Sequence, residues 1–261
     1  MDLDAWFTQL QSRADAPPVA TRVPLFLSDP HAEIGSIEPA LAQRMHKTGL
    51  PLSANGGAWC IDGAADAALA ELARWLYIHG LGSNWRDELL AVCDTSNRTV
   101  GVIERAAVRP LGITTHAVHL VGHTQGGEVW VQQRALDKAT DPGQWDTLVG
   151  GLVAAGETPR DALERETWEE AGLRLAELHA LRPAGRTLTI RRPVREGYLV
   201  EHIDTFEARL PRGAAPRNQD GEVERFECLP PAMLAARLAE GQFTLEAALM
   251  LAGWLRDRGR L

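Results

Sequence analysis

Three glutamates at helical spacing, Glu166, Glu169 and Glu170, have the residue type and arrangement needed to bind a metal ion. On a helix, which turns about 100° per residue, they share an arc of roughly 100° on one face. Carboxylates this close repel one another by about a few tenths of a kcal/mol per pair, and a divalent cation would offset that repulsion. Because the donors are oxygen atoms, the cluster favours Mg²⁺ or Mn²⁺ over Zn²⁺. A solvated acidic helix face is the alternative interpretation.

The segment that carries these glutamates has clear helix boundaries. Thr158 is a typical N-cap, Pro159 is a preferred first helical residue, and Asp161 follows the cap by three residues. Gly172 is a typical residue just past a helix end. The pattern therefore predicts a helix over 159–171. Its buried stripe is expected to consist of Leu163, Thr167 and Ala171.

The same segment matches the pattern G-x5-E-x7-R-E-U-x-E-E-x-G-U, where U is an aliphatic residue. The matching residues are Gly151, Glu157, Arg165, Glu166, Glu169, Glu170, Gly172 and Leu173. Seven fixed residues at an average usage of about 7 % would coincide by chance less often than about once per hundred thousand sequences. The segment thus resembles the Nudix box of the Nudix hydrolases. Thr167 occupies a position that is usually aliphatic in that family, and threonine has the shape of valine.

The resemblance implies an αβα sandwich with a mixed sheet and metal-dependent hydrolysis of a phosphoanhydride bond in a diphosphate. It also implies that Glu157 and Arg165 orient the metal site, with Arg165 part of the catalytic set. The implied metal ligands are the backbone carbonyl of Gly151 and the side chains of Glu166, Glu169 and Glu170.

A carboxylate must accept the proton of the attacking water. Within the box this base is Glu169 or Glu170, which we expect to face solvent. In many relatives it is an acid in a later loop, and Glu222 and Glu224 are then the candidates; the alternative is that these two residues only edge a strand.

Residues outside the box extend the match over most of the chain. They include Gly112, His119, Trp130, Arg134, Lys138, Asp146, 195–197 and 220–223, and on the N-terminal side 26–27, 34–35, 85–88 and 104–107. They resemble a Nudix subgroup that has its own N-terminal domain and is fused in some fungi to thiamine pyrophosphokinase. This resemblance implies hydrolysis of thiamine diphosphate, or of its oxidised analogues, to the monophosphate and phosphate. Gly122 and His123 depart from the Asn-Gly of that subgroup.

The candidate substrate-binding residues combine cations with one aromatic ring. Five arginines fall within 182–195, a stretch without acids, and form the best local attractor for phosphate in an acidic chain. The segment is expected to be a loop that binds phosphate or substrate, and a loop that is only solvated is the alternative. Trp145 either stacks on a substrate ring or packs in the core. The candidates are Arg134, Lys138, Trp145, Asp146, Arg191 and Arg192.

Composition and charge argue against a protein that binds duplex nucleic acid and against one that spans a membrane with helices. The chain has 261 residues and a net charge of −8, shared equally by the residues before and after the Pro110 boundary. Duplex nucleic acid is therefore excluded as the main partner. Apolar runs reach about eight residues, whereas a membrane helix needs about 18. The acidic start of the chain and three widely spaced cysteines indicate a cytoplasmic protein.

Strands mixed with a few helices, without βαβ periodicity, predict an α+β fold. The segment 109–112 breaks the pattern, so we place a smaller α+β N-terminal companion domain at 1–110 and the Nudix domain at 111–261. Helices are expected within 1–14, 62–80, 159–171, 231–240 and 244–258. Strands are expected at 90–93, 99–103, 116–121, 128–133, 198–209 and 222–229.

Three functions remain open. The first is hydrolysis of a small organic diphosphate, and the second is hydrolysis of nucleoside diphosphate derivatives or oxidised nucleotides. The third is a sensor that binds a diphosphate without turnover, although sensors often lose box glutamates and this chain keeps them. The oligomeric state is also open, with a homodimer as one alternative.

Overall fold

The structure, a computed structural model, describes residues 3–260, and within them the side chains of all residues except 3, 4 and 185–187. Within this range the larger sheet has strand order β11-β12-β7-β8-β13, with β10 paired to β7 and β9 paired to β8. Its strands are β7 (Thr114–His123), β8 (Val129–Arg134), β9 (Trp145–Asp146), β10 (Val149–Leu152), β11 (His179–Val194), β12 (Gly197–Arg209) and β13 (Val223–Leu229).

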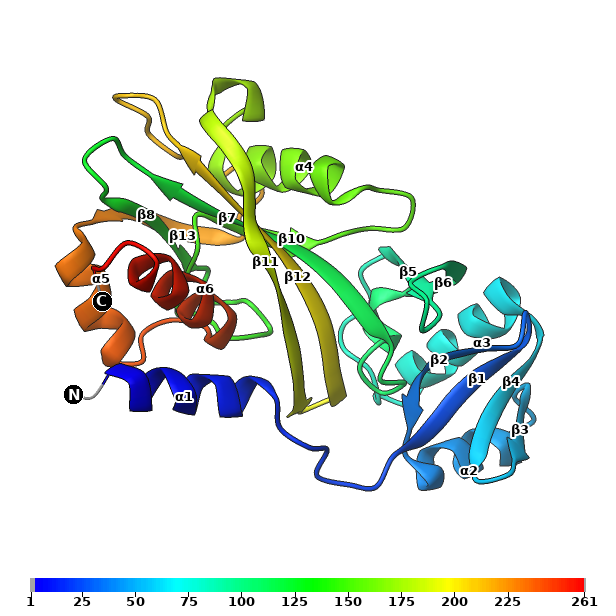
Figure 1. The fold of residues 1–261 in the computed structure, drawn as a ribbon. Coiled ribbons are helices and arrows are strands. Elements are labelled where there is room, and N and C mark those ends of the chain that lie inside the picture. Colours follow the sequence, from blue (N-terminus) through cyan, green and yellow to red (C-terminus); the bar gives the residue numbers. More distant parts are fainter. Residues whose placement is uncertain (1–2, 261) are drawn as a thin grey trace.

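This sheet is mixed and is covered on both faces (Figure 1). Strands β7 and β12 run parallel, whereas the other pairs in the sheet are antiparallel. Alternate side chains of β7 point to opposite faces. Val118 and Leu120 pack with Leu163 of α4, whereas Ala117 packs in the core that contains Leu251 of α6. The helices of these two layers are α4 (Pro159–Ala171) on one face and α1 (Leu3–Ala14), α5 (Pro231–Ala239) and α6 (Leu245–Arg256) on the other. The expected sandwich with a mixed sheet is confirmed.

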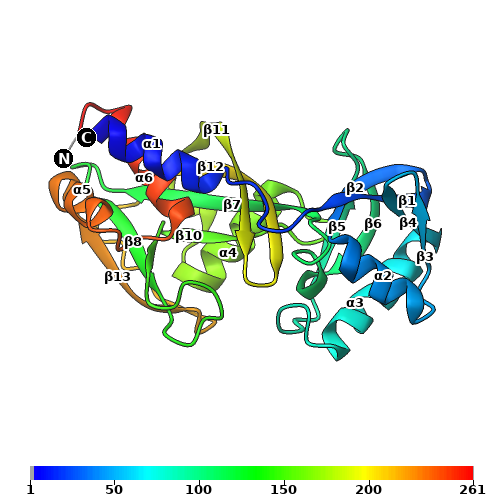
Figure 2. The ribbon, with the colours of Figure 1, turned by 90° about the horizontal axis from the view of Figure 1, so that it is seen from below.

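A second, smaller sheet with strand order β2-β1-β4-β3 lies at the other end of the molecule (Figure 2). Its strands are β1 (Val23–Asp29), β2 (Ala32–Ile37), β3 (Leu52–Asn55) and β4 (Ala58–Ala64). The neighbouring hairpin consists of β5 (Leu89–Cys93) and β6 (Thr99–Glu104). The helices of the small sheet are α2 (Pro39–Lys47) and α3 (Ala65–Ile78). Helix α1 instead lies against α6 and β11, beside the larger sheet. The predicted domain boundary after Pro110 stays a prediction.

The small sheet is joined to the larger one by close backbone approach. The Ser36 N–H donates to the Leu111 carbonyl at 3.0 Å, and the Arg22 guanidinium donates to the Pro110 carbonyl at 2.6 Å. A Cβ at position 35 would lie 2.6 Å from the Leu111 oxygen, so this contact requires glycine. Gly112 has φ 53°, a conformation that glycine adopts without penalty.

Two parts of the fold differ from the expectation. The arginine-rich segment, expected to be a loop, forms most of β11 and pairs with β12 along its length. Strands β1 to β4 and helix α2 were not predicted. No helix in residues 3–260 is long and apolar enough to cross a membrane.

Thr167 offers a test of core packing in α4. Its side chain is fully buried, and its hydroxyl has no hydrogen-bond partner among the described residues. Burying an unpaired hydroxyl costs about 1–3 kcal/mol, so Thr167→Val is expected to raise the free energy of unfolding by about 1 kcal/mol. Thermal unfolding should show a Tm higher by about 2–4 °C. The control Thr158→Val removes the N-cap hydroxyl and should lower the Tm. A lower Tm for Thr167→Val would contradict the prediction.

Candidate active site

Helix α4 begins and ends where its local sequence predicts. The Thr158 hydroxyl accepts a hydrogen bond from the Asp161 N–H at 3.2 Å, and the Asp161 carboxylate accepts one from the Thr158 N–H at 2.9 Å. Gly172 terminates the helix with φ 62°, in the left-handed region. These caps fix where the helix begins and ends, and its packing on β10 determines which face is buried.

Arg165 connects the loop before α4 to the carboxylates on the helix. Its Nε and Nη2 atoms donate to the two Glu157 oxygens at 2.8 and 2.9 Å, and Nη2 also donates to the Leu152 carbonyl at 3.0 Å. Its Nη1 atom donates to Glu166 at 2.7 Å and to Glu169 at 3.1 Å. One guanidinium thus holds three carboxylates, and its ion pair with Glu157 keeps the pKa of that carboxyl below its ordinary value.

Glu170 is buried, at 2 % exposure, although the sequence indicated that it faces solvent. The reason is its position at the edge of the acidic arc, next to the stripe that packs on β10. Its Oε2 atom accepts hydrogen bonds from the Gly150 N–H and from Gln132 Nε2, both at 2.9 Å. Burial, together with the nearby charge of Glu166, raises the pKa of Glu170 to about 8 despite these two donors.

Glu166 is buried less deeply, and it lies against Gly151. Burial raises the pKa of Glu166 to about 7, and the Arg165 guanidinium opposes that shift. A Cβ at position 151 would overlap the Glu166 carboxylate, so glycine is needed for the carboxylate to lie against the β10 backbone. The Glu166 carboxylate is consequently a close neighbour of the Gly151 backbone.

The donors present here fit a hard divalent cation. They are oxygen atoms, and two of the carboxylates have pKa values raised by burial and mutual repulsion, which a bound cation would reverse. Within the described residues no group of three His, Cys, Asp or Glu side chains already converges as around a metal. Arg165 instead occupies Glu166 and Glu169, so binding a cation requires that these ion pairs rearrange.

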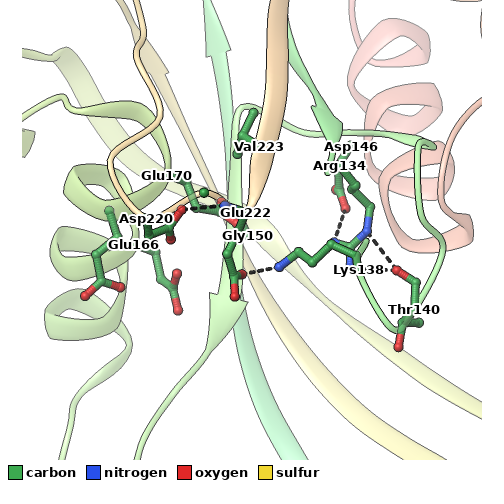
Figure 3. A network of polar contacts seen from close by, with 12 residues as sticks. Arg134, Lys138, Thr140, Asp146, Gly150, Glu166, Glu170, Asp220, Glu222 and Val223 are labelled. Atoms are coloured by element: carbon green, nitrogen blue, oxygen red, sulfur yellow. Dashed lines mark hydrogen bonds and ion pairs between the residues drawn. The ribbon is translucent and has the colours of Figure 1, made fainter. Parts of the chain in front are cut away.

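Glu222 faces the glutamates of α4, Glu166 and Glu170, from the opposite side, as Figure 3 shows. The loop before it is attached to the end of α4, where the Gln219 N–H donates to the Glu169 carbonyl at 2.9 Å. Lys138 forms an ion pair with the Glu222 carboxylate. Burial alone would raise the pKa of Glu222, but the Lys138 ammonium, with Arg105 and Arg86, holds it below its ordinary value.

Arg134 and Asp146 form a pair of their own next to this region (Figure 3). Arg134 Nη1 lies 3.4 Å from Asp146 Oδ2, and Arg134 also donates to the Thr140 carbonyl. His119 Nδ1 lies 3.6 Å from the other Asp146 oxygen. Asp146 is buried, and it links strands β7, β8 and β9.

Trp145 is buried at 4 % exposure in the core around Phe243 and α6. The Arg225 and Arg237 guanidiniums lie 5.3 and 5.2 Å from the centre of its ring. Stacking of a substrate on Trp145 would require one of these side chains to move away.

Arg191 and Arg192 lie on β11 and make other contacts. Arg192 pairs with Glu246 of α6 at 3.3 Å, and the Arg191 carbonyl accepts a hydrogen bond from the Ala16 N–H. Arg182 of the same segment pairs with Glu207. No contact between the described side chains connects these arginines to the box glutamates, and the side chain of Arg186 lies outside the described ones.

Gln132 is a site residue that sequence analysis missed. It is 1 % exposed, it donates to Glu170, and its own Oε1 has no partner among the described residues. A single glutamine in a strand carries no sequence signal. Only the packing of α4 on the sheet identifies it.

Comparison with known proteins agrees with this geometry. The model of the NUDIX domain family matches residues 113–249, which is more than half of the chain. The chain therefore belongs to the NUDIX family. Among its relatives, the uncharacterized Nudix hydrolase PA4841 of Pseudomonas aeruginosa is 40 % identical over 99 residues, covering 38 % of this chain and 57 % of that protein.

Two further similarities cover more of the chain. Nudix hydrolase 20, chloroplastic, of Arabidopsis thaliana is 31 % identical over 192 residues, or 67 % of this chain and 48 % of that protein. The crystal structure of DR0079 from Deinococcus radiodurans has a TM-score of 0.52 and 27 % identity, and the match covers 63 % of this chain and 97 % of that one. The chain spans about half the length of the curated relatives named here.

Proposed function

We propose that this Nudix protein hydrolyses a phosphoanhydride bond of a small organic diphosphate, releasing the monophosphate and phosphate. The observation that carries the proposal is the arrangement of the α4 carboxylates opposite the Lys138–Glu222 ion pair. Negative groups on one side and a cation on the other provide both a metal site and a contact for phosphate oxygens.

In this proposal the Gly151 carbonyl, Glu166, Glu169 and Glu170 hold Mg²⁺ or Mn²⁺. When bound, such an ion would supply neutralisation of the phosphate charge and a water of lowered pKa. Arg165 and Glu157 keep the carboxylates in place before the ion binds, because Arg165 already contacts Glu166 and Glu169.

Glu222 is the proposed general base, with Glu169 and Glu170 as alternatives. The Lys138 ammonium keeps the pKa of Glu222 low, so the carboxylate is ionised at neutral pH and able to accept a proton. Glu170 instead accepts two hydrogen bonds that hold it in place. A phosphate that approaches Lys138 weakens the ion pair and frees the Glu222 oxygen.

The proposed substrate is thiamine diphosphate or one of its oxidised analogues, which rests on the sequence resemblance outside the box. The test is phosphate release from purified protein on a panel of thiamine diphosphate, an oxidised analogue and nucleoside diphosphate derivatives, each with Mg²⁺ and with EDTA. We expect metal-dependent release that is fastest with the thiamine compounds. Faster cleavage of the nucleoside compounds would overturn the thiamine substrate only. Binding without release from any compound would indicate a sensor and overturn the proposed hydrolysis.

A further inference from the structure

The β5–β6 hairpin of the N-terminal part is attached to the loop that precedes α4. The Ala155 N–H, inside the Nudix box, donates to the Leu89 carbonyl at the start of β5 at 2.8 Å. Strand β5 also lies beside β7 of the larger sheet (Figure 1). The residues that flank this hairpin therefore have a fixed position relative to the box.

Two arginines, Arg86 and Arg105, flank the hairpin at this attachment. The Arg105 N–H donates to the Glu88 carbonyl at 2.9 Å, and its guanidinium pairs with the Glu88 carboxylate at 2.6 Å. The Arg86 N–H donates to the buried Glu104 carboxylate at 2.9 Å, which fixes the backbone there. The Arg86 side chain is exposed, and no hydrogen bond or ion pair to its guanidinium is found among the described residues.

Both guanidiniums act on the carboxylate that faces α4. The low pKa of Glu222 has its main electrostatic cause in Lys138, followed by the charges of Arg105 and Arg86. The hairpin that these two arginines flank is held next to the box by the hydrogen bond from the Ala155 N–H to the Leu89 carbonyl. The N-terminal part thus adds positive charge to the side of the site where Lys138 already lies.

Each of the two guanidiniums has N–H donors available for a ligand. Arg105 uses Nη1 for Glu88, and the guanidinium group carries five N–H donors in a fixed planar fork. This fork matches the oxygens of a phosphate group better than the ammonium of a lysine does. A diphosphate held by a cation on α4 would present its remaining oxygens to this opposite side.

We propose that Arg86 and Arg105, supplied by the N-terminal part of the chain, bind phosphate oxygens of the substrate's diphosphate. This inference rests on the proposed function and adds a role for the N-terminal part, which supplies phosphate ligands to a site whose metal ligands come from α4. It also places the contact on the diphosphate, which all candidate substrates share.

The test uses Arg86→Gln, Arg105→Gln and the double variant in the full chain, assayed on the same panel with Mg²⁺. A lost charge-assisted hydrogen bond to phosphate is expected to lower kcat/KM by about 10- to 100-fold in each single variant, mainly through KM and for every diphosphate in the panel. The matched control is Arg98→Gln at the tip of the same hairpin, where Arg98 pairs with Asp94. We expect kcat/KM of this control to stay within about twofold of the wild type.

Glu88→Gln separates phosphate binding from a role in holding the hairpin. It breaks the same ion pair as Arg105→Gln but keeps the guanidinium, so kcat/KM is expected to stay equal or to rise. If Glu88→Gln and Arg105→Gln lower kcat/KM equally, Arg105 only positions the hairpin and its part in the proposal is overturned. Unchanged kcat/KM in the double variant overturns the whole inference and leaves the proposed function standing.

If the wild type hydrolyses no compound in the panel, the proposed function is overturned. The inference is then tested by calorimetry, which measures the affinity of each variant for inorganic pyrophosphate in the presence of Mg²⁺. We expect pyrophosphate to bind at least tenfold more weakly to the double variant than to Arg98→Gln. Equal affinities would overturn the inference.

Discussion

Glu170→Gln is expected to lower kcat by about two or more orders of magnitude, because it removes a metal ligand or the base. Glutamine has the shape of glutamate, and its Oε1 can accept the hydrogen bonds that Gly150 and Gln132 now donate. The fold should therefore persist. The measurement is the steady-state rate of phosphate release with Mg²⁺, and the control is Glu164→Gln, an exposed residue of the same helix. Wild-type activity in Glu170→Gln would contradict the assignment of this residue.

Glu170→Gln is expected to raise the thermal stability of the protein although it lowers kcat. The pKa of Glu170 is about 8 in the folded protein, against an ordinary value of 4.5. Between pH 5 and pH 8 the unfolded chain releases a proton that the folded protein retains, so this group makes the folded state less stable as the pH rises. Glutamine cannot ionise. In EDTA, Glu170→Gln should therefore have a higher Tm than the wild type at pH 8, and a smaller advantage at pH 5. A Tm below that of the wild type at both pH values would indicate a structural role.

Local signals account for what the sequence predicts well. The caps at Thr158 and Gly172 act within a few residues of the chain, and the structure places both ends of α4 where they indicate. The hairpin of β7 and β8 and the final two helices follow from periodicity in the same way. Such signals need no knowledge of distant contacts.

The parts that sequence analysis missed depend on contacts between distant segments. The burial of Glu170 depends on Gly150 and Gln132, which lie 20 and 38 positions away in the chain. Strand β11 is rich in arginine, and its pairing with β12 stabilises it where composition indicated a loop. In the N-terminal sheet, β1 pairs parallel with β4 and antiparallel with β2, and nothing local in the sequence specifies that order.

Glu222→Gln is expected to lower kcat by about two orders of magnitude, the usual effect of losing a general base. Its neighbour Glu224 is exposed on β13 and provides the matched control, so Glu224→Gln should leave kcat within about twofold of the wild type. Circular dichroism of both variants checks that each one is folded. A small effect at Glu222 together with a large one at Glu169→Gln would move the role of base into the box.

Lys138→Met tests the same assignment through pH dependence. Lys138 is the main electrostatic cause of the low pKa of Glu222, so its removal should raise that pKa. A general base acts only when it is ionised, and kcat/KM therefore increases as the pH rises through its pKa. The rise of kcat/KM with pH is accordingly expected to occur at higher pH in Lys138→Met than in the wild type. In Glu222→Gln this rise should be absent at the pH where the wild type shows it. In Lys138→Met, kcat/KM could instead fall equally at every pH while its rise stays at the wild-type pH. That result would show that Lys138 contacts substrate without controlling the base, and that the rise reports the ionisation of another group.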